Sequence, residues 1–143
     1  MTDIVILDGA RTAIGTFGGA LANTAPIDLA TVASKAALER SGVAPEQIGH
    51  VVFGHVINTE PRDMYLSRVA AMQAGIPNGT PAMNVNRLCG SGAQALVSGT
   101  QSRMLGDADY ALTCRPATLS RRPFITPSPR RAPTMGAVHT TSR

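Results

Sequence analysis

The amino-acid sequence predicts an α/β fold in which a mainly parallel sheet is covered by helices. Two observations support this prediction: short apolar runs alternate with longer stretches of helical period, and the connections between them are short. The resulting order βαβαβαβ requires crossover connections, which are right-handed in parallel sheets. At 143 residues and 43% apolar composition, the chain has the size of one domain.

Four short apolar runs are predicted to be strands, at residues 3–8, 50–57, 81–86 and 109–113. The first two are rich in Val and Ile and do not alternate between apolar and polar residues. That pattern is typical of strands buried on both faces of a parallel sheet. The stretch 11–25 is rich in Gly and Thr without any period, so we expect a loop there.

Three helices are predicted between the strands, over residues 28–41, 64–74 and 90–105. In the first helix apolar residues recur every three or four positions, and Gly42 is placed to end the helix in the left-handed conformation. The buried face expected for this helix comprises Leu29, Val32, Ala33, Ala36 and Ala37.

The third predicted helix is small on nearly every side, with Gly92, Ala95 and Gly99 among its residues. Glycine destabilises an isolated helix by about 1 kcal/mol per residue, so we expect this helix to be buried centrally, with other layers close to it. Arg103 is its one long cation. Because an unpaired buried Arg is strongly destabilising, we expect Arg103 to find a carboxylate or the helix to pack less well.

The positive charge of the chain, +4 overall, lies entirely at its end. Residues 1–113 contain seven basic and nine acidic residues, whereas residues 114–143 contain six Arg and no acidic residue. Since no face of the fold concentrates the charge, we expect no nucleic-acid partner.

No apolar run approaches the roughly 20 residues that cross a bilayer, and the start lacks the pattern of a signal peptide. We therefore expect no membrane association and a cytoplasmic location.

No metal site is predicted. Cys89 and Cys114 do not have the spacing of metal-ligating cysteines. His50 and His55 are five residues apart on a predicted strand, which places them on opposite faces and favours ordinary strand residues over shared ligands.

Cys89 is the candidate for chemistry. It lies where a predicted strand gives way to a glycine-rich helix start, and the positive end of a helix stabilises the reactive thiolate form of cysteine. Gly90 and Gly92 leave room for a substrate carbonyl and for backbone donors to an oxyanion. The alternative is a small buried core residue, because free cysteine is among the most buried residue types. From spacing alone, both interpretations stay open.

The surroundings of Cys89 resemble the nucleophile region of the thiolases. Residues 84–98 read NVNRLCGSGAQALVS, residues 8–15 read DGARTAIG like the opening of that family, and residues 106–109 read GDAD like the step into its fourth strand. Residues 58–66 read NTEPRDMYL, which resembles broad-range β-ketothiolases more than acetoacetyl-specific enzymes. The related ketoacyl synthases also use a cysteine at a central helix start, but with different flanking residues.

The resemblance implies a thiolase-like fold and an acyltransferase that works on coenzyme A thioesters as substrates, with no bound cofactor. Cys89 would take an acyl group from acyl-CoA and pass it to CoA or to a second acetyl-CoA. Members of the family are homodimers or homotetramers, and residues 83–86 would lie at the dimer contact.

The family also uses a His in a Gly-His-Pro motif, an Asn-Glu-Ala-Phe motif and a second Cys next to Gly, and none of these occurs in the 143 residues. We therefore expect residues 1–113 to be a partial thiolase N-terminal domain. For the chain by itself we favour a non-catalytic, truncated product that folds partially, aggregates or pairs through exposed strands. The alternative is a polypeptide of an active thiolase that is catalytic only as part of a longer chain.

Residues 114–143 are predicted to form a divergent, poorly ordered tail rich in Pro and Arg. The family pattern stops after Thr113, resumes at residues 123–128 and is lost again, which favours a local change of reading frame over a new basic function. A genuine tail is the alternative. Cys114 lies at the start of this segment and is not expected to form a catalytic pair with Cys89.

Overall fold

The computed structural model describes residues 3–122, and the remaining residues of the predicted tail, 123–143, lie outside this range. Three parallel strands form the sheet: β1 (Ile48–Gly54), β2 (Ala82–Val85) and β3 (Tyr110–Cys114). Their order is β2-β1-β3, so the first strand in sequence is central. The prediction of an α/β fold with a parallel sheet is confirmed.

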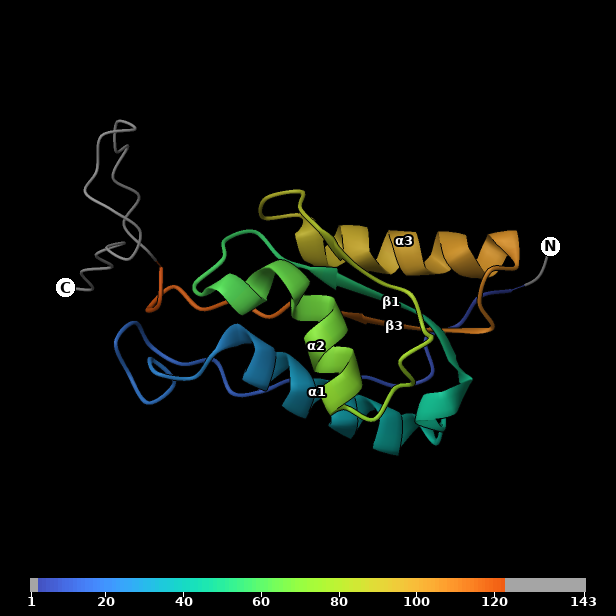
Figure 1. Ribbon diagram of the computed structural model, residues 1–143, viewed down its shortest axis with the longest axis horizontal. Coiled ribbons are helices and arrows are strands. Elements are labelled where there is room, and N and C mark those ends of the chain that lie inside the picture. The colour runs from blue at the N-terminus through green and yellow to red at the C-terminus, as the bar shows by residue number, and fades with distance from the viewer. Residues whose placement is uncertain (1–2, 123–143) are drawn as a thin grey trace.

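Two layers of helix enclose the sheet. On one face lie α1 (Pro26–Ser41) and α2 (Leu66–Gln73), which pack against each other, while α3 (Ser91–Leu105) covers the opposite face (Figure 1). Two short 3-10 helices, Pro45–Gln47 and Pro61–Tyr65, lead into β1 and α2. Val51, Val52 and Phe53 of β1 are fully buried as a result, which is why that run shows no polar alternation.

The ends of α1 follow the sequence signals, but its buried face does not. Pro26 occupies the first helical position, and Gly42 ends the helix with φ of 68°. Apart from Pro26, the buried side chains are Ile27, Ala30, Thr31, Ser34 and Leu38, not the five residues that the apolar pattern predicted. Val32, one of those five, is 61% exposed. The helix tolerates Thr31 inside because its hydroxyl bonds Ile27 O and Gln73 Oε1, both at 2.8 Å.

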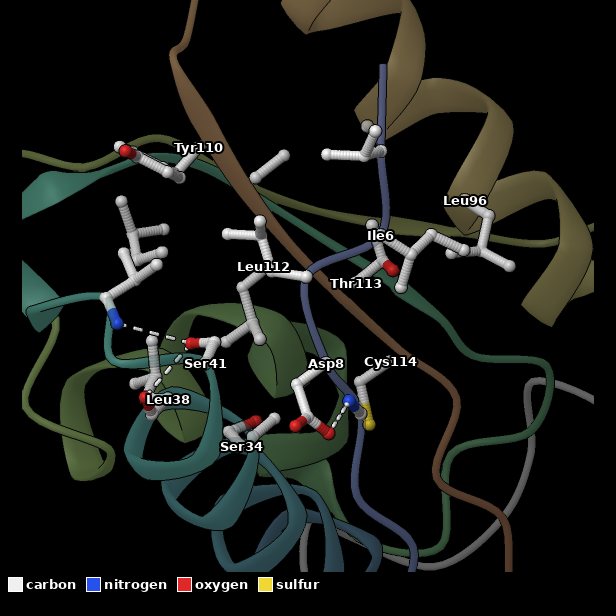
Figure 2. A pocket seen from close by; sticks show the side chains of 18 of the residues that line it. Ile6, Asp8, Ser34, Leu38, Ser41, Leu96, Tyr110, Leu112, Thr113 and Cys114 are labelled. Carbon is white, nitrogen blue, oxygen red and sulfur yellow. Dashed lines mark hydrogen bonds between the residues drawn. The ribbon is translucent and has the colours of Figure 1, made fainter. Parts of the chain in front are cut away.

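The strand predicted at residues 3–8 does not form. The segment carrying Ile6 and Asp8 runs beside β3 without any backbone hydrogen bond to the sheet. Between the segment, β3, α1 and α3 lies a largely apolar cavity of about 520 Å³, lined by Leu112 and Cys114 of β3 among others (Figure 2). We call this cavity the β3 slot. It separates the segment from β3, so the apolar run finds no strand partner and Ile6 stays 79% exposed.

The small residues of α3 bring it unusually close to the sheet, as predicted. A Cβ on Gly99 would lie 2.7 Å from Thr113 Cγ2, so only glycine fits there. The expected central burial is not met within the described residues: Leu96 and Val97 are about half exposed, and Met104 is 73% exposed. Arg103 meets Asp109 with 3.8 Å between Nη1 and Oδ1, but this ion pair lies at the surface, where the two side chains are 38% and 85% exposed, so the Arg is not buried as the helix pattern suggested.

One apolar core lies between the sheet and the helices α1 and α2. Its buried members come from all three of these parts, and they include Ile27, Leu38, Ile48, Phe53, Leu66, Ala70, Ile76 and Leu112. Within the described range, none of the helices is both long and apolar enough to span a membrane.

Candidate active site

Cys89 lies on the connection between β2 and α3, and its side chain is exposed. Figure 1 shows this connection in yellow, standing away from the sheet at the N-terminal end of α3. The alternative of a buried core cysteine is therefore contradicted. The thiol precedes the first helical residue, Ser91, by two positions, which is where the sequence placed it.

A tight double turn presents the thiol. Gly90 N donates to Arg87 O at 3.0 Å, and Ser91 N donates to Leu88 O at 3.1 Å, so the chain folds back on both sides of Cys89. Leu88 adopts φ of 49°, the one positive φ of a non-glycine residue in the described part of the chain. The backbone next to the candidate nucleophile is thus held in a conformation that L-residues rarely adopt.

The start of α3 rests directly on the central strand. A Cβ on Gly54, the last residue of β1, would lie 2.6 Å from the carbonyl carbon and oxygen of Ser91. Any larger residue at Gly54 would push the helix start away from the sheet. The sequence reasoning missed Gly54, although a glycine at the end of a buried strand is a signal of close backbone approach.

Two cations lie near the first turn of α3. Arg87 donates from Nη1 to Gln94 Oε1 at 2.9 Å, and Arg115, just after β3, lies over Gly92, where an added Cβ would meet Arg115 Cδ at 3.0 Å. Both Arg side chains thus lie against the first turns of α3, whose N-terminal end itself favours negative charge.

A second network ties β2, which leads into the turn, to the start of α2. Asn84 accepts a hydrogen bond from Ser67 N at 2.9 Å and donates to Met64 O at 3.0 Å. Asp63 is fully buried and accepts through Oδ2 from both N and Oγ1 of Thr59, at 2.6 and 2.8 Å. These residues were not predicted from the sequence. The Asn84 contacts join elements that only the fold brings together, whereas the contacts between Thr59 and Asp63 lie within four residues of the chain.

Cys114 differs from Cys89 in every respect that matters for reactivity. It is the last residue of β3, it lines the β3 slot, and burial raises its thiol pKa to about 11. Both cysteines are free. The neutral thiol of Cys114 is a packing residue rather than a second nucleophile, in agreement with the sequence.

The two histidines of β1 and its exit have separate partners. His50 Nδ1 lies 2.6 Å from Ser102 Oγ, and His55 Nε2 lies 3.0 Å from Asn58 Oδ1. Among residues 3–122, no three His, Cys, Asp or Glu side chains are grouped as metal ligands.

Known proteins share this sequence and this fold. A model of the family "Thiolase, N-terminal domain" matches residues 4–141, which runs past Thr113, so the domain boundary at residue 113 stays a prediction. The β-ketothiolase BktB of Cupriavidus necator is 50% identical over 94% of this chain, and an acetyl-CoA acetyltransferase of the same organism is 42% identical over 95%. The chain spans only about a third of the length of these relatives, 34% in both cases.

Solved structures agree. Human mitochondrial 3-ketoacyl-CoA thiolase in complex with CoA superposes with a TM-score of 0.80 at 32% identity, over 95% of this chain and 36% of that one. The acetyl-CoA acetyltransferase of Bacillus anthracis gives 0.84 at 30% identity, over 96% and 35%. A family model that covers nearly the whole chain, together with these relatives and folds, establishes that the chain belongs to the thiolase family.

Proposed function

We propose that Cys89 is the nucleophile of a CoA-dependent acyltransferase, and that this chain supplies the part of a thiolase that carries the covalent intermediate. In the degradative direction the thiolate attacks the β-carbonyl carbon of a β-ketoacyl-CoA, a carbon–sulfur bond forms, the bond between the α- and β-carbons breaks, and acetyl-CoA leaves after its α-carbon gains a proton. The acyl group then passes to the sulfur of a second CoA, which loses its thiol proton, and the Cys89 thiolate is restored. In the condensing direction the thiolate attacks the thioester carbon of an acyl-CoA, CoA leaves as its thiol after gaining a proton, and the enolate of an acetyl-CoA takes the acyl group from Cys89.

The exposure of Cys89 on the strained turn before α3 carries this proposal. An acyl-CoA is a large substrate, and its thioester reaches only a thiol that stands clear of the sheet. The positive end of α3, with Arg87 and Arg115 beside its first turns, favours the binding of the phosphates of CoA. Cys114, by contrast, is half-buried at the end of β3 and lines the β3 slot.

The substrate class that we favour is the broad range of β-ketoacyl-CoA esters. Support comes from the higher identity to the β-ketothiolase of Cupriavidus necator, 50%, than to the acetyl-CoA acetyltransferase of that organism, 42%. Residues 58–66, which the sequence comparison singled out, enclose the buried Asp63 and lead into α2.

The second candidate function is a chain that does not turn over by itself. Cys89 makes no hydrogen bond to a base within residues 3–122, and the family's Gly-His-Pro motif is absent from the sequence. Within residues 3–122, β2 and β3 are the edge strands of the sheet, and together with the β3 slot they favour pairing with another polypeptide or with a second copy of the chain. We further propose that residues 83–86, which comprise most of β2 and Asn86, contact a second copy in a homodimer or homotetramer, and sedimentation of the purified protein would measure that oligomeric state.

Acetylation by acetyl-CoA tests the assignment. The purified chain is incubated with acetyl-CoA, and intact mass is compared for the natural protein, Cys89→Ala and the matched control Cys114→Ala. We expect one acetyl group on the natural protein and on Cys114→Ala, and none on Cys89→Ala. Labelling that survives Cys89→Ala would contradict the proposal, and release of the acetyl group to added CoA would exclude the non-catalytic alternative.

A thioester of an acyl carrier protein separates thiolase from ketoacyl synthase chemistry. We expect acetyl-CoA to label Cys89 and acetyl-acyl-carrier-protein to leave it unmodified under the same conditions. The reverse preference would assign the chain to the synthases.

A further inference from the structure

The conformation of Leu88 requires something to hold it. A positive φ is unfavourable for a residue with a Cβ by about 1–2 kcal/mol, and the φ of Leu88 is 49°. Its own side chain contributes little to holding the turn because it is 69% exposed. The restraint must therefore come from the polar groups around its backbone.

Two side chains bind the backbone of Leu88 from opposite sides. Asn86 Oδ1 accepts a hydrogen bond from Leu88 N at 3.0 Å, and Ser91 Oγ donates one to Leu88 O at 2.7 Å. The Ser91 hydroxyl also accepts a hydrogen bond from Arg87 N at 2.9 Å. The Ser91 hydroxyl thus bridges Arg87 N and Leu88 O. These two backbone groups lie on either side of the bond about which the φ angle of Leu88 is measured.

Ser91 is the better anchored of the two. Its side chain is fully buried, and its backbone rests on Gly54 of the central strand. Asn86 is exposed. Ser91 therefore connects the turn directly to β1, whereas the exposed Asn86 reaches only Val56 O, just after β1, at 3.4 Å.

We propose that Ser91 is a positioning residue for Cys89: its hydroxyl, assisted by Asn86, holds Leu88 in the left-handed conformation and thereby keeps the thiol at the positive end of α3. The importance of this role for catalysis rests on the proposed function. The position of the thiol itself depends only on the turn. Without the hydroxyl, Leu88 relaxes towards negative φ and Cys89 leaves the helix axis. The neighbouring cations Arg87 and Arg115 are unchanged by this loss.

The rate at which iodoacetamide alkylates Cys89 reports the position of the thiol, and this measurement needs no acyl-CoA. Rates are read from the mass of the Cys89 peptide in the full chain between pH 6 and 10, with Cys114 as an internal reference. We expect Ser91→Ala to slow Cys89 about fivefold at neutral pH, the equivalent of one lost hydrogen bond, and Asn86→Ala to slow it less. At the alkaline end of the range, the rates at Cys89 in the variants should approach the rate in the natural protein. The pH of half-maximal rate therefore rises in these variants, which loss of stability alone does not cause.

Two further variants decide the interpretation. In Ser98→Ala, a hydroxyl on the same helix that accepts from Gln94 Nε2 at 3.2 Å is lost, and the profile should stay unchanged. In the double variant Ser91→Ala with Leu88→Gly, glycine adopts positive φ without strain, so the natural profile should return. If Ser91→Ala does not fold, Asn86→Ala still tests the turn, because Asn86 is exposed.

An unchanged pH profile in Ser91→Ala, or in Asn86→Ala where the serine variant does not fold, overturns the proposal. So does a failure of Leu88→Gly to restore Ser91→Ala. Either result leaves acetylation by acetyl-CoA, and hence the proposed function, untouched. Conversely, a shifted profile in a protein that acetyl-CoA does not label would support the positioning role and contradict the function.

Discussion

The turn that carries Cys89 is closed by its own hydrogen bonds, whereas the β3 slot is bordered by groups that lack partners in the described residues. The turn is closed by hydrogen bonds among residues 86–91 and rests on Gly54, so everything that shapes it is present in the described residues. The slot is bordered by an apolar segment without strand partners, and the buried Ser34 Oγ beside it has no hydrogen-bond partner there. A turn made of short-range contacts can therefore be fully formed although a nearby apolar segment stays unpaired.

The largest effect is expected for Gly54→Ala, which attacks the turn through its support. The new Cβ would lie 2.6 Å from the backbone of Ser91 and cannot be relieved by moving a side chain. We expect a loss of about 3 kcal/mol in the free energy of unfolding, measured in urea. Gly79→Ala is the control, since its Cβ would meet nothing within 4 Å, and it should stay within about 0.5 kcal/mol. Equal effects would mean that α3 does not rest on β1.

The pH dependence of stability that Cys114 causes tests whether water is excluded from the β3 slot. Burial raises its pKa from 9.0 to about 11, so the folded protein retains a proton that the unfolded chain releases. This contribution to stability is complete below pH 9 and is lost as the pH rises towards 11, by at most about 1.4 kcal/mol per pH unit. The stability of Cys114→Ala should fall less steeply over that window. Parallel curves for the two proteins would mean that water reaches the slot.

Ser102 and Ser34 allow a comparison between a buried hydroxyl that has hydrogen-bond partners and one that has none in the described residues. Ser102 Oγ bonds His50 and Ser98 O beneath α3, whereas Ser34 Oγ is buried without a partner. Ser102→Ala should destabilise by about 1 kcal/mol, and Ser34→Ala should be neutral or stabilising. Thermal unfolding of both variants measures the difference. A clear loss in Ser34→Ala would reveal a partner for its hydroxyl and a slot that is better satisfied than described.

The smallest effect on stability is expected for Ile6→Asp on the border of the slot. Ile6 is 79% exposed, so the free energy of unfolding should change by less than about 0.5 kcal/mol. The exposed apolar surface at the slot should decrease, which the fluorescence of a hydrophobic dye and light scattering would detect. Ile14→Asp, at a residue 84% exposed and away from the cavity lining, is the matched control. Equal dye binding in both variants would mean that the slot does not bind the dye.

Local signals predicted most of the fold. The glycines that end α1 and α3 lie in the left-handed conformation at Gly42 and Gly106, because that requirement is local. The three strands that formed lie within a few residues of their predicted ranges. The segment 3–8 has the same β-branched composition as β1, yet it did not pair, because pairing depends on a neighbour that composition does not specify.

The candidate site was predicted only in part. Cys89 and its place before α3 follow from the strand-to-helix transition and the glycines. The positive φ of Leu88 and the buried hydroxyl of Ser91 do not, because leucine gives no signal of a left-handed turn and serine is common near any helix start. The buried face of α1 was missed for a related reason. Thr31 is polar, but it can be buried because its hydroxyl donates a hydrogen bond to Ile27 O on the same helix.

The central place of β1 in the sheet has a consequence for synthesis on the ribosome. Both neighbours of β1 follow it in the chain, and the more distant one, β3, ends at Cys114. One edge of β1 therefore stays open until nearly all of the described chain has left the exit tunnel, even though α1 and β1 emerge early. During that interval the most apolar strand of the protein, with Val51, Val52 and Phe53, must be shielded from other nascent chains, which makes β1 the segment where we expect a chaperone to bind.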